Sequence, residues 1–329
     1  MSENLTFRVF KEEDIPALIA LWEENSDWGE LSEEEFRRWF LNVPEGNCII
    51  AVAENQNGKI IGQEVFTPST IWVVGKEKKA LRVSAPILAK EIRANMEQSV
   101  SPLLGMYKLG LQTAAERGYS ILYSFPLRAW LILFKLSTKM GLGKVQTAEY
   151  DCYSLSLKSV SSRTFSAGKE LHVSLLEEFN RDFDSLWESA KENFPVNCGI
   201  ARNSERLQWK LKLGGDWVLQ ARSTDGNLIG YMAINKKTNL LVDMLARTPE
   251  DLENVFSAVV RTLCESEDLL KLTNLQEIKL VKTDIFANIT EKFNFTKIDF
   301  KFAFCCYSLD DEITAQMVNP ARWYMMPND

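Results

Sequence analysis

The chain of 329 residues contains a long internal repeat. Its first half carries, in order, Leu21-Trp22-Glu23, Trp39 and Asn57-Gly58-Lys59-Ile60-Ile61-Gly62; its second half carries, in the same order, Leu186-Trp187-Glu188, Trp209 and Asp225-Gly226-Asn227-Leu228-Ile229-Gly230. Trp187 lies 165 positions after Trp22, Trp209 lies 170 after Trp39, and Gly226 lies 168 after Gly58. Solenoid repeats are far shorter, roughly 20 to 50 residues. The repeat therefore predicts two copies of one domain.

The same order of elements is expected in each half: a strand, two helices, a glycine hairpin, further strands, a long helix, a strand, a helix and a closing strand. We predict a first domain at 1–157, a polar, serine-rich linker at 158–169 and a second domain at 170–329. The expected class is α/β of the α+β type, with a mixed, mostly antiparallel sheet flanked by helices in each domain. Tyr150 to Leu157 is predicted to complete the first domain, and the four repeat tryptophans, Trp22, Trp39, Trp187 and Trp209, to lie in the cores.

Charge and composition exclude several classes of protein. A net charge of −7 and a pI near 5.2 argue against nucleic acid as a partner, because a nucleic-acid interface needs clustered Lys and Arg. The six cysteines lack CxxC spacing and the only histidine is His172, so no metal site is predicted. Neither a signal peptide nor an apolar run that could span a bilayer is present, which predicts a cytoplasmic protein without a membrane role.

The ordered set of motifs resembles the GNAT superfamily of acyl-CoA-dependent N-acetyltransferases, in the form in which two such domains share one chain. The matching segments in the first half are the hairpin Cys48 to Phe66, the helix Pro102 to Gly118, Phe125-Pro126 and Lys139-Met140-Gly141-Leu142. In the second half they are Asp225 to Gly230 and Lys292-Phe293-Asn294-Phe295. The resemblance covers nearly the whole chain.

This resemblance implies acetyl-CoA as the co-substrate. In the superfamily, backbone N-H groups of a glycine-rich loop before a helix bind the pyrophosphate of coenzyme A. The matching position here is Glu97 to Leu103, so the implied cofactor-binding residues are Gln98, Ser99, Val100, Ser101 and Leu103. Ser101 is expected to cap a helix that begins at Pro102. The segment contains no glycine. In the second half, Thr248 and Pro249 are expected to start the equivalent helix.

Acetyl transfer to an amine needs a base for the ammonium proton and an acid for the leaving thiolate. Glu64, on the returning hairpin strand, is the candidate base if its carboxyl is buried, where its pKa would be raised; strand alternation could instead turn it to solvent. Tyr123 on the fifth strand and Tyr107 on the preceding helix are candidate acids, or core aromatics. Asp243, a lone acid in an apolar strand, is either catalytic or a structural hydrogen-bond acceptor.

Two features lie outside this scheme. His172 opens the second half without a nucleophilic partner at a recognisable spacing, so we expect a surface or edge histidine. The aromatic segment 320–329 is expected to dock, either over a cleft between the halves or against its own domain.

The function that follows from the resemblance is acyl-CoA-dependent N-acylation, with N-acetylation first, of an amine on a small molecule or peptide. A non-catalytic GNAT-fold binding or scaffold protein that has lost coenzyme A binding is the alternative from a different class. Aminoacyl transfer from tRNA is a third reading, which the acidic net charge disfavours.

Overall fold

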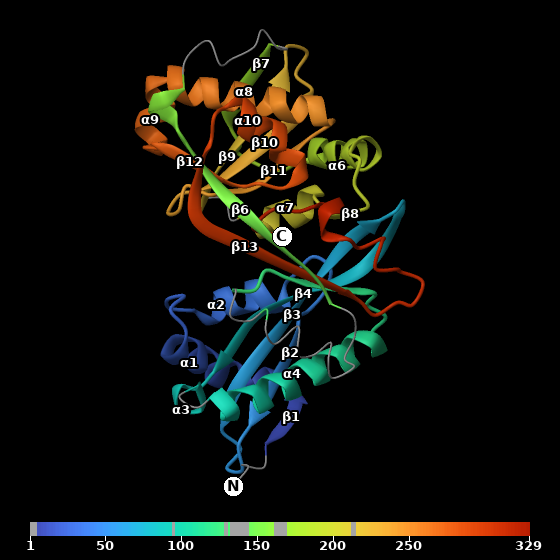
Figure 1. Cartoon of the computed structure of the whole chain (residues 1–329). Helices are drawn as coiled ribbons and strands as arrows, with labels where there is room; N and C mark the ends of the chain where they lie inside the picture. Colours follow the sequence, from blue (N-terminus) through green and yellow to red (C-terminus); the bar gives the residue numbers. More distant parts are fainter. Residues whose placement is uncertain (1–4, 94–95, 128–130, 132–144, 161–169, 212–214) are drawn as a thin grey trace. The chain divides into compact units, whose positions relative to one another are not determined.

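The computed structural model describes residues 5–93, 96–127, 131, 145–160, 170–211 and 215–329 (Figure 1). The chain divides into two compact units. The first unit contains Met1–Ile71, Glu77–Thr147 and Ala303–Pro320, and the second contains Trp72–Lys76, Ala148–Phe302 and Ala321–Asp329. Each unit is thus completed by segments from the other half of the sequence.

The first half of the chain follows the predicted order of elements. These elements are β1 (Thr6–Val9), α1 (Ile15–Asn25), α2 (Glu33–Phe36), a π-helical turn (Arg37–Leu41), β2 (Ile49–Glu54), β3 (Ile60–Val73), β4 (Lys76–Leu88), α3 (Lys90–Arg93), α4 (Met96–Glu116), β5 (Ile121–Ser124) and β6 (Gln146–Ser156).

The second half repeats that order. Its elements are β7 (Leu171–Leu175), α6 (Arg181–Asn193), β8 (Cys198–Ile200), α7 (Ser204–Lys210), β9 (Asp216–Ser223), β10 (Leu228–Asn235), β11 (Leu241–Ala246), α8 (Pro249–Glu265), α9 (Glu267–Thr273), β12 (Glu277–Val281), α10 (Ala287–Lys292), β13 (Thr296–Ser308) and β14 (Trp323–Tyr324).

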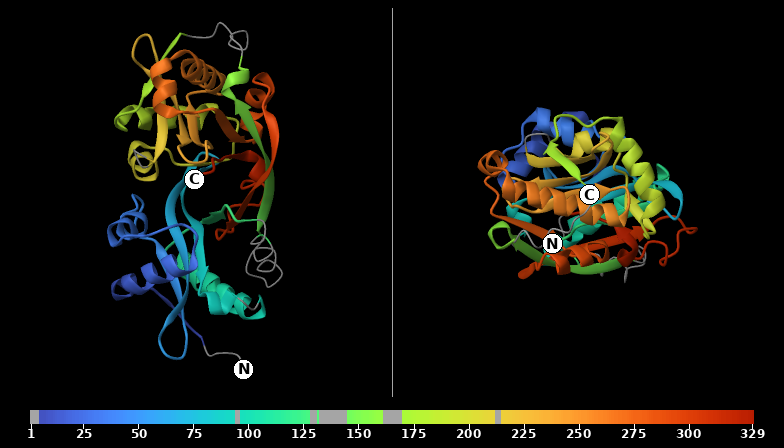
Figure 2. Two further views of the ribbon diagram at one scale, coloured as in Figure 1. Left: turned by 90° about the vertical axis from the view of Figure 1, so that its left-hand side faces the viewer. Right: turned by 90° about the horizontal axis from the view of Figure 1, so that it is seen from above.

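In the first unit the strands lie in the order β1-β2-β3-β4-β5, followed by β13. Helices α1 and α2 cover one face of this sheet and α4 covers the other (Figure 2). Helix α4 packs closely because Gly105 and Gly110 lack side chains: a Cβ would lie 2.3 Å from the ring of Phe7 at Gly105 and 2.0 Å from that of Phe66 at Gly110. The α4 face of β3 therefore includes Phe66.

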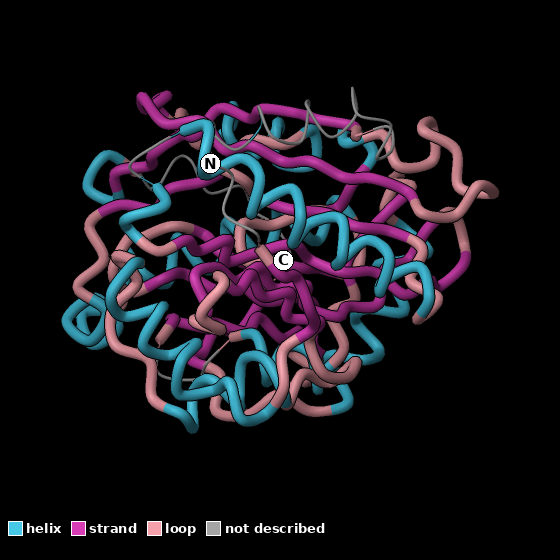
Figure 3. The backbone as a smooth tube through the Cα atoms, turned by 90° about the horizontal axis from the view of Figure 1, so that it is seen from below, coloured by secondary structure: helices cyan, strands magenta, loops and turns pink. Residues whose placement is uncertain are grey.

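In the second unit, β11, β10, β9 and β7 form a four-stranded sheet in that order. Helix α8 buries an apolar stripe that includes Val255, Phe256 and Val259. Thr248 caps α8 by accepting a hydrogen bond from Asp251 N at 3.0 Å, as predicted. Strands lie among helices in the view coloured by secondary structure (Figure 3).

The closing strands are exchanged between the units. Residues Cys305 to Ser308 of β13 pair antiparallel with Ser124 to Ile121 of β5 in the first unit. Residues Cys152 to Ser156 of β6 pair antiparallel with Val281 to Glu277 of β12 in the second unit. The expectation that Tyr150 to Leu157 completes the first domain is therefore wrong, because the pairing partner lies on β12. Sequence periodicity predicts a strand but not its neighbour. The domain boundaries at residues 157 and 170 stay a prediction.

The last glycine of each repeated hexapeptide has the same packing role. A Cβ on Gly62 would lie 2.7 Å from Leu88 and 3.1 Å from Met106 of α4. On Gly230 it would lie 2.5 Å from the carbonyl oxygen of Leu245 and 2.9 Å from Val255 of α8. In both copies a glycine lets the long helix approach the hairpin strand. The earlier glycines, Gly58 and Gly226, have φ of 73° and 82°, as the predicted turns require.

Other expectations need correction or fall outside the described residues. Helix α4 begins at Met96 rather than at Pro102, which lies inside it. Of the four repeat tryptophans only Trp187 is buried; the other three are half-buried. Lys139-Met140-Gly141-Leu142 and most of the predicted linker 158–169 lie outside the described ranges.

The aromatic segment near residue 329 is docked, as predicted. Trp323, Tyr324, Met325 and Met326 are each no more than 2% exposed, and they belong to the second unit. This is the alternative in which the segment packs against its own domain. His172 is exposed on the edge strand β7, also as expected. No helix in the described ranges is long and apolar enough to cross a membrane.

Candidate functional site

The first unit contains a pair of parallel strands that separate along their length. Strands β4 and β5 pair at Ala80↔Ile121, Leu81↔Leu122 and Arg82↔Tyr123, whereas β4 continues to Leu88. At the point of separation Ser124 Oγ donates a hydrogen bond to Val83 O at 2.8 Å. Backbone groups need hydrogen-bond partners, so an edge of β4 beyond β5 is suited to an extended ligand that carries its own donors and acceptors.

The backbone of β4 is strained just beyond this point. Ala85 has a φ of 50°, a left-handed conformation that a residue with a Cβ seldom adopts inside a strand. Ser84, Ala85 and Pro86 are half-buried, unlike their neighbours Ile87 and Leu88, which are buried. Such strain is concentrated at ligand-binding and catalytic sites. It marks this segment of β4 as the candidate site.

Glu64 lies on β3 and is only 6% exposed. Its Oε2 has no hydrogen-bond partner among the residues that the structure describes. Burial raises the pKa of this carboxyl from 4.5 to about 8. The alternative that strand alternation turns Glu64 to solvent is therefore wrong, because both faces of β3 are covered. The carboxyl has the raised pKa that a base working near neutral pH needs.

The structure brings Glu64 close to Tyr107 of α4. Burial, together with the negative charge of Glu64, raises the pKa of Tyr107 above its usual range, and its ring stacks on Phe66 at 6.3 Å. Glu64 and Phe66 are two residues apart on β3, so they share the face that α4 covers. Tyr107 is therefore the tyrosine that shares the electrostatic environment of Glu64.

Tyr123 lies elsewhere. Its hydroxyl is hydrogen-bonded to Ser69 Oγ at 3.2 Å, and the residue is 1% exposed. Ser69 is an odd-numbered residue of β3, like Thr67, which contacts Cys48 Sγ. Alternation along the strand places odd-numbered residues on the face opposite to Glu64. A catalytic role for Tyr123 stays a prediction, and its contacts are those of a core aromatic.

The residues implied to bind the cofactor lie in the first two turns of α4. Val100 is half-buried, Ser101 is exposed and Leu103 is buried, so Leu103 contributes to the core; the side chains of Gln98 and Ser99 are outside the described part of the structure. The segment that directly follows β4 is instead Ala89 to Arg93, with α3 at Lys90–Arg93. Its exposed cations, Lys90 and Arg93, were not predicted. The sequence pattern that could have pointed to them is an apolar strand that ends at Leu88 and is followed within five residues by two basic residues.

Asp243 is part of a buried charge network in the second unit. It accepts hydrogen bonds from Arg202 Nε at 2.9 Å, Lys210 Nζ at 2.5 Å and Met244 N at 2.8 Å. Asp329 accepts from Arg202 Nη2 at 2.7 Å and from Lys210 Nζ at 2.7 Å. Asp243, Asp329 and Arg202 are fully buried, and Lys210 is 4% exposed. These contacts are those of the structural acceptor; a catalytic role for Asp243 stays a prediction.

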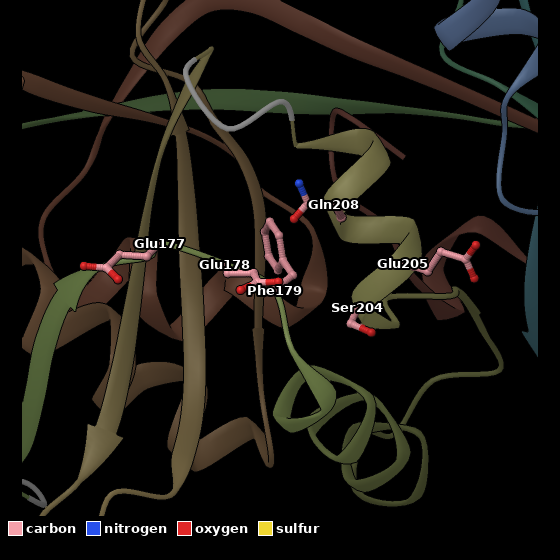
Figure 4. Close-up of a pocket in the computed structure, with 6 residues that line it drawn as sticks. All are labelled: Glu177, Glu178, Phe179, Ser204, Glu205 and Gln208. Atoms are coloured by element: carbon pink, nitrogen blue, oxygen red, sulfur yellow. The ribbon is translucent and has the colours of Figure 1, made fainter.

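A pocket of about 480 Å³ lies on the second unit (Figure 4). Its lining comes from the segment after β7 and from α7: Glu177, Glu178, Phe179, Ser204, Glu205 and Gln208. Phe179 and Gln208 face each other, whereas the carboxylates of Glu177 and Glu205 point away to opposite sides (Figure 4). The acidic side chains therefore form the rim of the pocket rather than one binding point. Within the described ranges, no group of three or more His, Cys, Asp or Glu side chains is arranged to hold a metal ion.

The fold is shared with solved structures of acyltransferases. No protein-family model matches the sequence, and no curated protein matches it. The chain is similar to a protein from Enterococcus faecalis described as a probable N-acyltransferase, with 11% identity and a TM-score of 0.67 over 93% of this chain and 73% of that one. It is also similar to a GCN5-related N-acetyltransferase from Kribbella flavida, with 10% identity and a TM-score of 0.63 over 94% and 72% of the two chains.

N-myristoyltransferase from Saccharomyces cerevisiae, solved with bound myristoyl-CoA, has 11% identity and a TM-score of 0.58 over 92% of this chain and 78% of that one. The similarity extends over both halves of the chain. The protein therefore has the GNAT fold, in a two-unit form, as the resemblance of the sequence implied.

Proposed function

We propose that the protein is an acyl-CoA-dependent N-acyltransferase, with acetyl-CoA as the first co-substrate to test and an amine of a small molecule or peptide as acceptor. The observation that carries this proposal is the separation of β4 from β5 after three residue pairs. The pantetheine arm of coenzyme A is extended and contains amide groups, so it is suited to hydrogen-bond along the edge of β4.

The phosphates of coenzyme A are assigned to the end of β4. Lys90 and Arg93 are exposed there, immediately before α4, and the N-terminus of a helix favours negative charge. Lys90 N itself donates to Asn25 Oδ1 at 2.8 Å, which anchors the segment to the end of α1. In this assignment the side chains of Lys90 and Arg93 bind the phosphates, in place of the backbone N-H groups of a glycine-rich loop.

Glu64 is proposed as the base. Its carboxylate takes a proton from the acceptor's ammonium group, and the amine nitrogen then forms a bond with the thioester carbonyl carbon while the carbon–sulfur bond breaks. The nitrogen loses its second proton as the amide forms, and the leaving thiolate takes up one proton, so the products are the amide and the free thiol of coenzyme A. A pKa of about 8 makes Glu64 a stronger base than an exposed glutamate, and the buried site excludes competing water.

The alternative, a non-catalytic GNAT-fold binding or scaffold protein that has lost coenzyme A binding, is favoured by one observation: Glu64 is almost completely covered. Thermal unfolding with and without acetyl-CoA tests the first step, because a ligand that binds the folded state at 100 times its Kd stabilises it by about 2.7 kcal/mol. 3′,5′-ADP, which lacks the pantetheine arm, is the control. No shift with any acyl-CoA contradicts the enzyme and its cofactor and supports the alternative. Where binding is found, mass spectrometry of candidate amines after incubation with acetyl-CoA tests for the acylated product that the enzyme must form.

A further inference from the structure

The last residues of the chain lie along strand β11 of the second unit. Asn328 N donates a hydrogen bond to Val242 O at 3.3 Å, and the Tyr324 hydroxyl donates to Met244 O at 2.7 Å. Both acceptors are backbone carbonyls of β11. Segment 321–329 is thus hydrogen-bonded to the strand itself and not only packed against side chains.

The Met244 carbonyl is on the edge of β11 that faces away from β10. Arg247 N donates to Ile229 O, on the β10 side. The register between β10 and β11 shifts between Leu241 and Asp243. From Asp243 onward backbone groups alternate between the two edges of the strand, so those of Asp243 and Leu245 also face β10 and those of Met244 face the other edge. At that other edge, β12 is close only at the start: Leu240 forms a parallel bridge with Lys279, and Lys279 N donates to Asn239 O.

Strand β11 is the counterpart of β4. Each follows the hairpin strand that begins with the repeated hexapeptide, each precedes the long helix, and each has a parallel neighbour, β5 or β12, that pairs only near its start. In the first unit, Ser124 Oγ bonds to Val83 O where the strands separate. In the second unit, segment 321–329 occupies the corresponding edge.

The charge network holds this segment in place. Arg202 donates to Asp243 of β11 and to both carboxylate oxygens of Asp329, and Lys210 bridges the same two aspartates. Arg202 also lies over the ring of Tyr324, 4.9 Å from its centroid. Met326 N closes the turn by donating to Asp329 Oδ2 at 2.7 Å. Two cations and two carboxylates are therefore matched inside the unit, and loss of the segment would leave Arg202 and Lys210 with one carboxylate.

We propose that segment 321–329 fills the edge of β11 in the second unit. The corresponding edge of β4 in the first unit is the one proposed to bind acyl-CoA. The chain consequently carries one acyl-CoA site, in the first unit, although it has two copies of the fold. That segment 321–329 occupies the edge of β11 is argued from the contacts of the segment alone. That the chain has a single acyl-CoA site also rests on the proposed function.

Hydrogen exchange of the full chain without ligand tests the occupancy. The amides of Met326 and Asn328 are expected to exchange at least 100-fold more slowly than in a free peptide of the same sequence. Tyr324→Phe, which removes one hydrogen bond to β11, should accelerate exchange in this segment about tenfold, whereas Tyr119→Phe, a half-buried hydroxyl in the first unit, should leave it unchanged. Exchange at the free-peptide rate would overturn the proposal.

Titration calorimetry with acetyl-CoA tests the stoichiometry. One equivalent per chain is expected, and binding by Tyr324→Phe should have the same stoichiometry. Two equivalents per chain would contradict the filled edge in the second unit. Absence of any binding would contradict the proposed function and leave the exchange measurement to decide whether the segment occupies β11.

Discussion

The carboxyl of Glu64 and the phenol of Tyr107 share one buried face of the first unit's sheet, and the charge of Glu64 contributes to the raised pKa of Tyr107. A buried carboxyl is unfavourable for folding when ionised, and Oε2 of Glu64 has no hydrogen-bond partner in the described part of the chain. Its presence is understandable if the group has a chemical role, and the first predictions concern this group.

Stability should fall as the pH rises toward 8, because of Glu64. The folded protein keeps the Glu64 proton up to a pH of about 8, whereas the unfolded chain loses it near 4.5. The unfolded state therefore binds fewer protons between these values, and the free energy of unfolding decreases as the pH rises. Relative to its level at pH 5, the stability of Glu64→Gln should exceed that of the wild type by about 4 kcal/mol at pH 9. Urea unfolding at several pH values measures this; parallel profiles would contradict the raised pKa.

Glu64→Gln should also separate catalysis from binding. Without the base, kcat should fall about 100-fold while the affinity for acetyl-CoA stays within twofold. The wild-type kcat should rise with pH and level off above about pH 8, where the carboxyl is ionised. Steady-state kinetics and calorimetry give the two quantities. Unchanged turnover would remove Glu64 from the mechanism.

Much of the element order was predictable from the sequence, and the partners of the elements were not. The helical spacing around Trp187 and the glycine turns at Gly58 and Gly226 depend on local geometry, which the sequence records directly. The exchange of β6 and β13 depends on which distant strand offers an edge. No local pattern encodes that choice, so the closing strands were assigned to the wrong neighbours.

The candidate site was predictable where it depends on local sequence and not where it depends on distant partners. A lone glutamate in an apolar strand singled out Glu64. The assignment of Gln98 to Leu103 to the cofactor stays a prediction, and it was made with Pro102 expected to begin a helix. The helix instead starts at Met96 and contains Pro102. Asp243 was correctly singled out as a buried acid, while its partner Asp329 is 86 positions away and has no sequence signal.

Lys90→Gln with Arg93→Gln should weaken acetyl-CoA binding about tenfold or more, because both cations lie where the phosphates are assigned. The loss should shrink as salt is raised, since exposed charges are screened. Lys76→Gln, at the first residue of β4, is the control for loss of positive charge. Equal affinities for the double variant and the control would contradict the assignment of the phosphates.

The two repeat glycines should differ in their tolerance of a methyl group. Gly230→Ala is expected to destabilise the protein by about 3 kcal/mol, because the added Cβ meets a backbone carbonyl oxygen at 2.5 Å. Gly62→Ala meets the side chains of Leu88 and Met106, which can move, so about 1 kcal/mol is expected. Denaturant unfolding compares them. The reverse order would show that the helices do not approach the strands as described.

Asp243→Asn should destabilise the protein by about 3 to 5 kcal/mol, because it leaves two buried cations with one carboxylate. Burial alone would raise the pKa of Asp329, but Arg202 and Lys210 lower it, so the remaining carboxylate stays ionised at neutral pH. Glu267→Gln, which removes an exposed ion pair with Lys271 at 3.1 Å, should change stability by less than about 0.5 kcal/mol. A small loss in Asp243→Asn would mean that the network is hydrated or open.

The central claim is that the edge of β4 in the first unit binds acyl-CoA. A crystal structure of the full chain grown with acetyl-CoA tests it most directly. The account predicts density for the pantetheine arm along Val83 to Leu88, with the phosphates next to Lys90 and Arg93, and segment 321–329 still on β11. Density for the cofactor along β11, or none at β4 at saturating concentration, would contradict it.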